Sequence, residues 1–234
     1  MDSPVLTCRE VSFHTRRKNA LREVSFSIGV GKIVGLFGPM DSGKSLLLQI
    51  AAGRLTPTGG KISVCGNESG REIRADVSYL PEWPVSPKQG RISTLMRQYA
   101  DFFPDFYPIR CQALLSRFDL PVHGKLKTLT TAQIQQLGLC LVLSRAVPLY
   151  LLDQPLSAVN PDTRTDCLRE VLAGRPAGSS VLIASSSVAP LEPVVDEALF
   201  LWNGRLCLSG TAAGIRAERG KSLSDVYAEG FEWE

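Results

Sequence analysis

The chain has 234 residues, of which 44% are hydrophobic and 21% charged, and its formal net charge at pH 7 is +3. These values exclude disorder over the whole chain and allow one large domain, or one domain carrying a smaller inserted lobe. The net charge is too small to predict nucleic-acid binding. Because no run of about 18 apolar residues occurs, we expect no membrane span, so that any role at a membrane acts through a partner.

Cysteine and histidine content limits the kinds of site that the chain can form. The six cysteines include no Cys-x-x-Cys pair, and the two histidines are His14 and His123. This pattern argues against a zinc cluster and favours reduced thiols that pack as small hydrophobic groups. The first residues, MDSPVLTCRE, show no apolar stretch of the signal-peptide type. We therefore expect a cytoplasmic protein.

The first third of the chain predicts short strands, separated by turns and one helix. IVGLF, at residues 33–37, is continuously apolar, as expected for a strand buried on both faces of a sheet. SLLLQIAAG, at 45–53, has helical character and ends in a glycine. Further strands are expected at residues 5–14 and 21–29, on either side of a basic turn at 15–19, and at 56–66 and 75–82.

Residues 84–148 differ in pattern and predict a helical lobe inserted into an α/β domain. Prolines punctuate its helical pieces, such as 92–103 and 109–120. The α/β domain then consists of residues 1–83 and 149–234. Helices expected at 132–146 and 163–174 alternate with strands expected at 149–152, 181–184 and 198–202. This alternation favours a mostly parallel sheet that is covered on both faces.

GPMDSGKS, at residues 38–45, fits the pattern G-x-x-x-x-G-K-S between a buried strand and a helix. Gly38 and Gly43 allow backbone angles and close approaches that a side chain would block, and the loop turns successive N–H groups toward an anion. Lys44 would reach the β- and γ-phosphates, and Ser45 would ligate Mg²⁺. The flanking strand and helix argue against a chance glycine-rich turn. The predicted nucleotide-binding residues are Gly38, Pro39, Asp41, Ser42, Gly43, Lys44, Ser45 and Leu46.

The strand at 149–152 places an acid at its end. LYLL runs into Asp153, the natural Mg²⁺ carboxylate of a phosphate-loop site. An acid in this position can instead cap a helix, but the phosphate loop elsewhere in the chain favours the metal role. The next residue is Gln154, an amide where a second carboxylate would complete a hydrolytic site.

Together these motifs resemble the nucleotide-binding subunits of ABC transporters over nearly the whole chain. After a two-stranded N-terminal region, the phosphate loop and a helical lobe come LTTAQ, LYLLDQP, SAVNP, VLIASSS and NGRLCLSG. FFPDFYP, RFDLP and SLSDVY resemble bacterial subunits that pair with separately encoded permeases. The resemblance implies a phosphate-loop ATPase fold, with a mostly parallel core sheet, an antiparallel N-terminal β subdomain and an inserted helical lobe. ATP and Mg²⁺ are the implied cofactors. It also implies that two subunits sandwich ATP head to tail, each phosphate loop facing the partner's signature, and that closure drives a membrane permease.

Two motifs depart from the family pattern on the lobe side. The signature LSGGQ reads LTTAQ, residues 129–133. Thr130 and Gln133 keep the polar groups of the motif, whereas Thr131 and Ala132 replace glycines and are expected to obstruct the approach to phosphate. The Q-loop position, which senses Mg²⁺ and water, is occupied by Glu82, which can still ligate a metal.

Further departures affect hydrolysis itself. Gln154 replaces the catalytic Glu, Asn160 replaces the D-loop acid, and Ser186 aligns with the switch His. Gln154 cannot take a proton at neutral pH, and loss of a general base slows a reaction by about 10²–10⁴-fold. A glutamine can instead orient the attacking water while the substrate phosphate accepts the proton. We therefore expect tight MgATP binding and weak hydrolysis, and leave open whether the chain is an enzyme by itself.

The resemblance predicts an energy subunit of a transporter at the inner face of the cell membrane, with export favoured by the C-terminal motifs. One alternative is a non-hydrolytic regulatory or scaffold subunit. Another is an ABC protein that serves translation or DNA repair, but such proteins usually carry two cassettes or long insertions, for which 234 residues leave no room. A heterodimer with an intact second ATP-binding subunit is favoured over a homodimer, because otherwise no energy source is evident.

Two aromatic residues each have two alternative roles. Phe13 either stacks on adenine, as the N-terminal aromatic of the family does, or packs in the core. The permease is expected to dock near the start of the helical lobe, where EWPVSP spans residues 82–87. There Trp83 is either an exposed interface anchor or a core residue.

Overall fold

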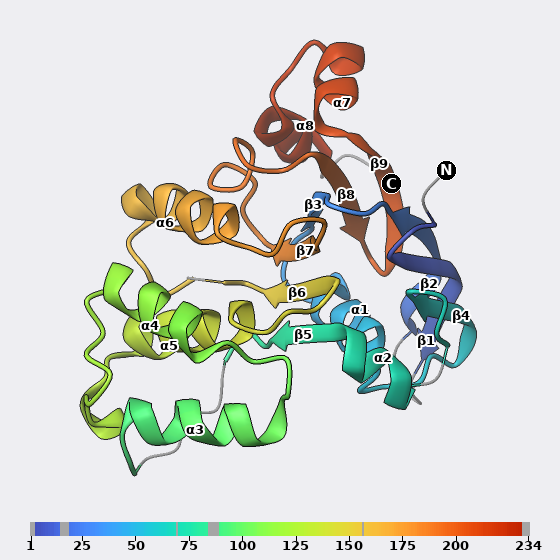
Figure 1. The fold of residues 1–234 in the computed structure, drawn as a ribbon. Helices are drawn as coiled ribbons and strands as arrows, with labels where there is room; N and C mark the ends of the chain where they lie inside the picture. The colour runs from blue at the N-terminus through green and yellow to red at the C-terminus, as the bar shows by residue number, and fades with distance from the viewer. Residues whose placement is uncertain (1–2, 15–18, 69, 84–88, 156, 231–234) are drawn as a thin grey trace.

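A six-stranded sheet forms the centre of the fold, with the strand order β5-β6-β7-β3-β8-β9 (Figure 1). Neighbouring strands pair in parallel, except β8 with β9, which confirms the predicted mostly parallel sheet. The computed structural model describes residues 3–14, 19–68, 70–83, 89–155 and 157–230. The strands of this sheet are β3 (Ile33–Phe37), β5 (Val77–Leu80), β6 (Leu149–Asp153), β7 (Ser180–Ser185), β8 (Glu197–Trp202) and β9 (Arg205–Thr211).

Both faces of the main sheet are buried, which explains why its strands are continuously apolar in sequence. In β6, Leu149 and Leu151 belong to one hydrophobic cluster, whereas Tyr150 and Leu152 belong to the other. Successive side chains of a strand point to opposite faces, so a strand covered on both sides needs apolar residues at every position. Helix α1 (Lys44–Ala51) covers one face and α6 (Pro161–Ala173) contributes to the other.

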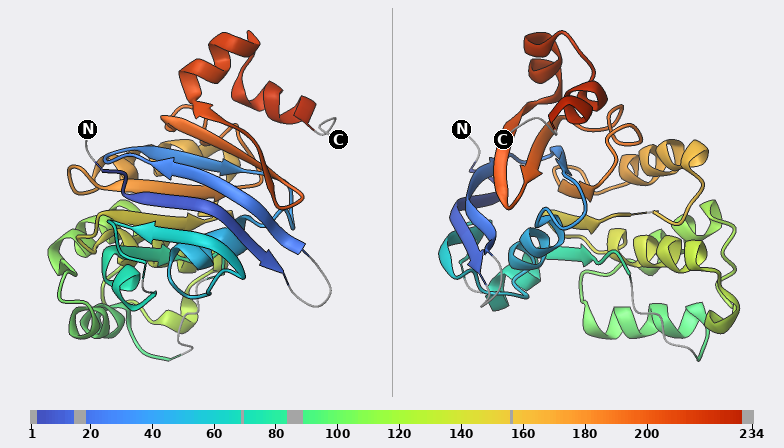
Figure 2. Two further views of the ribbon diagram at one scale, coloured as in Figure 1. Left: turned by 90° about the vertical axis from the view of Figure 1, so that its right-hand side faces the viewer. Right: turned by 180° about the vertical axis from the view of Figure 1, so that it is seen from behind.

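A second, antiparallel sheet lies beside the main sheet (Figure 2), in the order β2-β1-β4. The antiparallel N-terminal β subdomain is confirmed, and a third strand joins the two that precede the phosphate loop. After α1 the chain returns as β4 (Gly59–Val64), which pairs with β1 (Leu6–His14) along the edge opposite β2 (Asn19–Ile28). Ile62 and Val64 of β4 are buried in the same cluster as β1, so the third strand completes the hydrophobic cover of α1. Most of the predicted basic turn, residues 15–18, lies outside the described residues.

The predicted helical lobe consists of α3 (Ile92–Phe102), α4 (Pro108–Arg117) and α5 (Thr131–Leu143), with the 3-10 helix η1 (Leu126–Thr128) before α5. These elements follow β5 and precede β6 in the chain, and they lie together on one side of the molecule (Figure 1). They share one hydrophobic cluster with the main sheet rather than enclosing a core of their own. The lobe boundaries at 84 and 148 stay a prediction, and residues 84–88 lie outside the described part of the chain.

Three short helices were not predicted from the sequence. They are α2 (Gly70–Asp76), α7 (Ala212–Arg219) and α8 (Leu223–Glu229). Helix α8 begins with a capping box formed by Ser222 and Asp225, and the carboxylate of Glu192 accepts a hydrogen bond from the N–H of Leu223 at 2.7 Å. Tertiary contacts of this kind stabilise helices that are too short to form alone. None of the helices in the described part of the chain has the length and apolar character needed to cross a lipid bilayer.

Candidate functional site

The loop 38–45 joins the end of β3 to the start of α1, as the sequence predicts, and its two glycines serve different purposes. Gly43 is the N-cap of α1 with φ at 106°, in the left-handed region that favours glycine. A Cβ on Gly38 would lie 2.2 Å from the carbonyl oxygen of Leu201, so this position requires glycine because another strand passes close by. The N–H of Gly204, in the β8–β9 turn, donates to the carbonyl of Ser42 at 3.1 Å and holds the loop from outside.

Lys44 directs its ammonium group into the loop. Its Nζ donates hydrogen bonds to the carbonyl oxygens of Gly38 at 2.7 Å and Pro39 at 2.6 Å. Burial lowers the pKa of Lys44 from 10.5 to about 8, against the opposing effect of Asp153 and other nearby carboxylates. The mouth of the loop is a depression of about 300 Å³ lined by Ala20, Asp41, Gly43, Lys44, Ser45, Leu46 and Gln49. Of the predicted loop residues, Asp41 has φ at 60° and is exposed, whereas Ser42 is buried.

Asp153 ends β6 beside the phosphate loop and is only 2% exposed. Ser45 forms a side-chain hydrogen bond with this carboxylate, and burial nevertheless raises the pKa of Asp153. Its Oδ1 atom is buried without a hydrogen-bond partner. A buried carboxylate oxygen without a donor, next to a hydroxyl, is the donor set that Mg²⁺ prefers. Ser45 and Asp153 therefore fit the predicted metal role.

Glu82 follows β5 and is half-buried. Its carboxylate is close enough to Asp153 to raise the pKa of that group, and close enough to Lys44 to oppose the lowering of its pKa. The structure therefore brings the predicted Q-loop residue to the same edge of the sheet as the phosphate loop. Two carboxylates at this edge repel each other, and a divalent cation would relieve that repulsion.

Gln154 and Ser186 also meet at this edge. Gln154 has φ at 47°, which is uncommon for a residue with a side chain, and its N–H donates to the carbonyl of Ala184 at 2.9 Å. Its Oε1 accepts a hydrogen bond from the N–H of Ser186 at 3.3 Å. The exposed side chain of Ser186 is short, while the neighbouring Ser185 hydroxyl donates to the carbonyl of Ser187 at 2.7 Å. The amide of Gln154 is thus positioned beside the site but offers no proton acceptor at neutral pH.

The signature segment begins α5 with a reciprocal capping box. Thr130 Oγ1 accepts from the N–H of Gln133 at 3.2 Å, and Gln133 Oε1 accepts from the N–H of Thr130 at 3.0 Å. The Thr130 hydroxyl hydrogen can still be donated to a phosphate. Ala132 packs against the hydrophobic cluster of the lobe, whereas Thr131 is exposed. The methyl group of Ala132 therefore packs inward, and obstruction of the phosphate approach by Thr131 stays a prediction.

The predicted residues fall into two groups in space. The loop 38–45, Glu82, Asp153, Gln154 and Ser186 lie at the ends of β3, β5, β6 and β7. In the described part of the chain, no hydrogen bond or ion pair joins residues 130–133 to the phosphate loop. Asn160 is exposed at the start of α6, where its carbonyl accepts from the N–H of Arg164. An arrangement in which a second subunit supplies the missing group is therefore geometrically possible.

Two aromatic residues can now be placed. Phe13 lies opposite Leu21 of β2 and is half-buried against the hydrophobic cluster around α1. Leu21 itself lies next to the phosphate loop, because a Cβ built on Gly43 would be 2.8 Å from its side chain. Core packing of Phe13 is thus present, and adenine stacking stays a prediction. Trp83 is 63% exposed, so the alternative of a core residue is wrong for this side chain.

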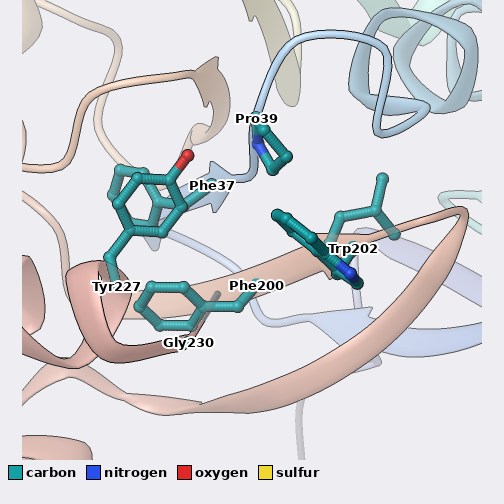
Figure 3. A pocket seen from close by; sticks show the side chains of 7 residues that line it. Phe37, Pro39, Phe200, Trp202, Tyr227 and Gly230 are labelled. Atoms are coloured by element: carbon teal, nitrogen blue, oxygen red, sulfur yellow. The ribbon is translucent and has the colours of Figure 1, made fainter. Parts of the chain in front are cut away.

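Pro39 of the phosphate loop borders a small apolar cavity under the C-terminal helix α8 (Figure 3). Its lining includes Phe37, Phe200 and Tyr227, whose rings pack with centroids 5.5 Å apart for Phe37 and Phe200 and 6.1 Å apart for Phe200 and Tyr227. The volume of the cavity is about 10 Å³, which is no more than one water molecule requires. This cavity is therefore too small to be a ligand site. The aromatic residues that line it pack beside Pro39 and support one side of the loop.

Sequence reasoning missed Gln135, which is only 2% exposed on α5 and hydrogen-bonds to segments on both sides of it. A signal was available, because Gln135 is four residues before Leu139 and seven before Val142, on the apolar face of the helix. A glutamine on such a face must satisfy its amide group inside the protein.

Known proteins resemble this chain along most of its length. A family model described as ABC transporter matches residues 21–157. The ABC-type transporter ATP-binding protein EcsA of Bacillus subtilis is 26% identical over 96% of this chain and 96% of its own length. The phosphonates import ATP-binding protein PhnC 1 of Rhodopseudomonas palustris is 28% identical over 90% of this chain and 81% of its own. A solved structure of an ATP binding subunit of an ABC transporter superposes with a TM-score of 0.84 at 25% identity, covering 96% of this chain and 98% of that chain.

Proposed function

This chain belongs to the ABC transporter family as an ATP-binding subunit, and we propose that it binds MgATP tightly, closes on it with a second subunit and hydrolyses it slowly by itself. The observation that carries the proposal is the joint placement of the phosphate loop and Asp153 beside an amide residue. Lys44 is held within the loop by two carbonyls, and Asp153 keeps a buried oxygen without a donor. Gln154 stands where a base would be needed.

In the proposed mechanism the backbone N–H groups of the loop and Lys44 bind the β- and γ-phosphates. Ser45, Asp153 and Glu82 would hold Mg²⁺, which would supply positive charge to offset that of the phosphates. Gln154 orients water but cannot remove its proton, so the γ-phosphate must accept it. The Ser186 side chain is too short to replace the reach of an imidazole. Hydrolysis by this chain is slow for both reasons.

ATP affinity should depend on pH through Lys44. The free chain holds this ammonium at a pKa of about 8, and bound phosphates would raise that pKa again because they favour the charged form. Affinity is therefore close to its maximum at pH 7 and falls as the pH rises through about 8 and the free lysine loses its proton, to about tenfold weaker at pH 9 than at pH 7. Calorimetric titration across this range measures the change. Lys44→Arg is the control, because its guanidinium stays charged and should show no such decline. An equally steep decline in Lys44→Arg contradicts the assignment.

A second ABC subunit completes the proposed sandwich, with the signature of each chain facing the phosphate loop of the other. In a homodimer each of the two ATP sites would contain Gln154 from one chain and the altered signature LTTAQ from the other, so both sites would carry both defects. In a heterodimer with an intact partner, the partner's phosphate loop meets Thr130 and Gln133, which keep their polar groups, and that site can turn over. We therefore propose a heterodimer. In this arrangement ATP binding favours closure, and turnover at the partner's site resets the complex.

The proposed membrane partner is a permease that docks on the lobe and keeps the chain at the inner face of the membrane. Support comes from exposed Trp83 after β5 and from an apolar groove of about 290 Å³ between α3 and α4, lined by Ser93, Met96, Arg97, Ala100, Pro108, Gln112 and Val122. Exposed tryptophans are common anchors of protein interfaces. The direction we propose is export, from the resemblance of the C-terminal motifs, although PhnC 1 is an import protein by its name.

Trp83→Ala should abolish capture of the permease while leaving the isolated chain intact. Interface tryptophans contribute about 2 kcal/mol or more to binding, which corresponds to about 30-fold in affinity. Co-purification of membrane proteins with the tagged chain from its native cell is the measurement, and ATP affinity and melting temperature are the controls. Exposed Phe102, at the end of α3 in the lobe, offers a matched substitution to Ala. Retained permease with Trp83→Ala, or its loss only with Phe102→Ala, contradicts this docking position.

The second candidate is a regulatory or scaffold subunit whose ATP occupancy holds a complex closed. The presence of Gln154 in place of the catalytic Glu supports this candidate as well. The two candidates differ in whether the complex hydrolyses ATP and transports, or only stays assembled while ATP is bound. ATP-dependent assembly without phosphate release from the whole complex would select the scaffold. Phosphate release by the complex, with a permease present, would select the transporter subunit.

A further inference from the structure

The amide of Gln135 makes hydrogen bonds to two segments that come from opposite ends of the helical lobe. Its Nε2 donates to the carbonyl oxygen of Glu82 at 3.2 Å and to the Ser157 hydroxyl at 2.7 Å. Its Oε1 accepts from the N–H of Ala158 at 2.8 Å. The side chain is only 2% exposed, and both halves of its amide are satisfied. One buried group on α5 thus joins the segment after β5 to the segment after β6.

The segment 157–160, which contains the residues aligned with the D-loop, is held from a second side. Arg164 of α6 donates to the carbonyl oxygens of Ser157 at 3.0 Å and Val159 at 2.9 Å. The N–H of Ser157 donates to the carbonyl of Gln154 at 3.3 Å. Contacts of Ser157, Ala158 and Val159 thus help to position Asn160, whose own carbonyl accepts from the N–H of Arg164 at 3.1 Å. Among the described residues, Gln135 supplies the only side chain from the lobe that hydrogen-bonds to this segment.

Gln135 lies two residues after Gln133, in the second turn of the helix that the Thr130 capping box begins. The helix start and the segment 157–160 both face a second subunit in the proposed sandwich, whereas Glu82 lies at the chain's own phosphate loop. A buried amide with all of its hydrogen bonds made resists displacement of any one partner, because a lost bond leaves an unsatisfied polar group. These bonds give a shift of Glu82 a direct route to the other two segments.

We propose that Gln135 is a positioning residue, which couples the state of the nucleotide at this chain's phosphate loop to the segment 157–160 and the start of α5. The proposal rests on the proposed function, because it requires nucleotide at the loop. When Glu82 engages the nucleotide, its carbonyl and Gln135 move together, and Ser157 and Ala158 follow. The chain's own ATP occupancy thereby adjusts the two segments that it offers to its partner.

Amide hydrogen exchange of the purified full chain tests this coupling, with ATP affinity measured on the same preparations. The protein concentration is one at which light scattering shows a monomer, so that no second chain protects the segments. Wild type should show slower exchange in residues 129–135 and 157–160 when MgATP is bound. Gln135→Met keeps the size of the side chain but loses every hydrogen bond of the amide. It should bind MgATP within about twofold of wild type, since it does not touch the nucleotide, and lose the protection of 157–160.

Gln135→Glu separates coupling from local packing. Its carboxylate can accept from the N–H of Ala158 and from the Ser157 hydroxyl, but it has no proton to donate to the Glu82 carbonyl at neutral pH. Exchange of Ala158 without nucleotide should stay slow, whereas the response to MgATP should be lost. Lower pH protonates this carboxyl, restores a donor and should return part of the response. Gln136→Met, on the next residue of α5, is the matched control and should behave as wild type.

The outcomes distinguish this proposal from the proposed function. Failure of wild type to bind ATP would overturn both. Tight binding without protection of 157–160, or unchanged protection in Gln135→Met, would overturn the coupling alone. A Gln135→Glu variant that responds to MgATP as fully as wild type at neutral pH would reduce Gln135 to a local packing role.

Discussion

Replacing Gln154 with Glu should raise phosphate release by the isolated chain by about 10²–10⁴-fold at saturating MgATP. The side-chain Oε1 of Gln154 already accepts a hydrogen bond from the N–H of Ser186, and a carboxylate oxygen can accept the same bond, so the substitution changes the chemistry of the group without moving it. A carboxylate at this point can remove the proton of the attacking water. ATP affinity should change little, because Gln154 is not among the groups that bind the phosphates. Steady-state phosphate release measures the gain.

Gln154→Ala is the control for this gain, because it removes the amide without supplying a base. It should bind MgATP and remain as slow as wild type or slower. If Gln154→Glu is no faster than wild type, the loss of activity belongs to Ser186, Asn160 and LTTAQ, and an intact partner is required. If Gln154→Ala is as fast as Gln154→Glu, the general-base explanation is wrong.

Asp153→Asn should weaken Mg²⁺ binding and, at neutral pH, stabilise the fold. Loss of a group that orients a metal commonly weakens metal affinity by about 10–100-fold, and the Mg²⁺ dependence of ATP binding should weaken by that amount. Burial raises the pKa of Asp153, so its charged form is less favourable in the folded chain than in the unfolded one. The neutral amide removes this penalty. Metal titration and urea unfolding measure the two effects.

The pH dependence of this stabilisation gives a further check of its cause. A carboxyl whose pKa is raised on folding destabilises the fold above its folded pKa, and the effect vanishes below the unfolded value of about 4, where both states hold the proton. Asp153→Asn should therefore be more stable than wild type at pH 7 and equal to it well below pH 4. Ser157→Ala, away from Asp153, should not show this pattern. An Asp153→Asn chain that binds Mg²⁺ as well as wild type contradicts the metal assignment. An Asp153→Asn chain that is less stable than wild type at pH 7 contradicts the effect of burial on this carboxyl.

The sequence predicted those parts of the site that depend on local spacing. The phosphate loop follows from Gly38, Gly43 and Lys44, because their spacing between a buried strand and a helix determines the backbone path. Asp153 could be placed because parallel strands end at one edge of a sheet. Its neighbour Gln154 could be aligned for the same reason, whereas its left-handed backbone angle could not be read from the sequence.

Features that depend on partners distant in the chain were not predicted. β4 joins the antiparallel sheet through pairing with β1, which lies some fifty residues earlier. Ala132 points inward because of its position on the buried face of α5. The substitutions in the signature sequence did not reveal which face of the helix this residue occupies. The sequence places Gln135 on the apolar face of α5, but it does not reveal the partners Glu82 and Ser157. In each case a long-range contact, and not local propensity, decides the structure.

The central claim is that this chain binds MgATP well and turns it over poorly. The most direct test is phosphate release by the purified wild-type chain, with ATP affinity measured on the same preparation. The account predicts saturable, Mg²⁺-dependent binding and a turnover well below about 1 s⁻¹, the lower end of ordinary enzymes. Rapid turnover by the wild-type chain alone would contradict it, and would mean that Gln154 and Ser186 sustain hydrolysis without the usual Glu and His.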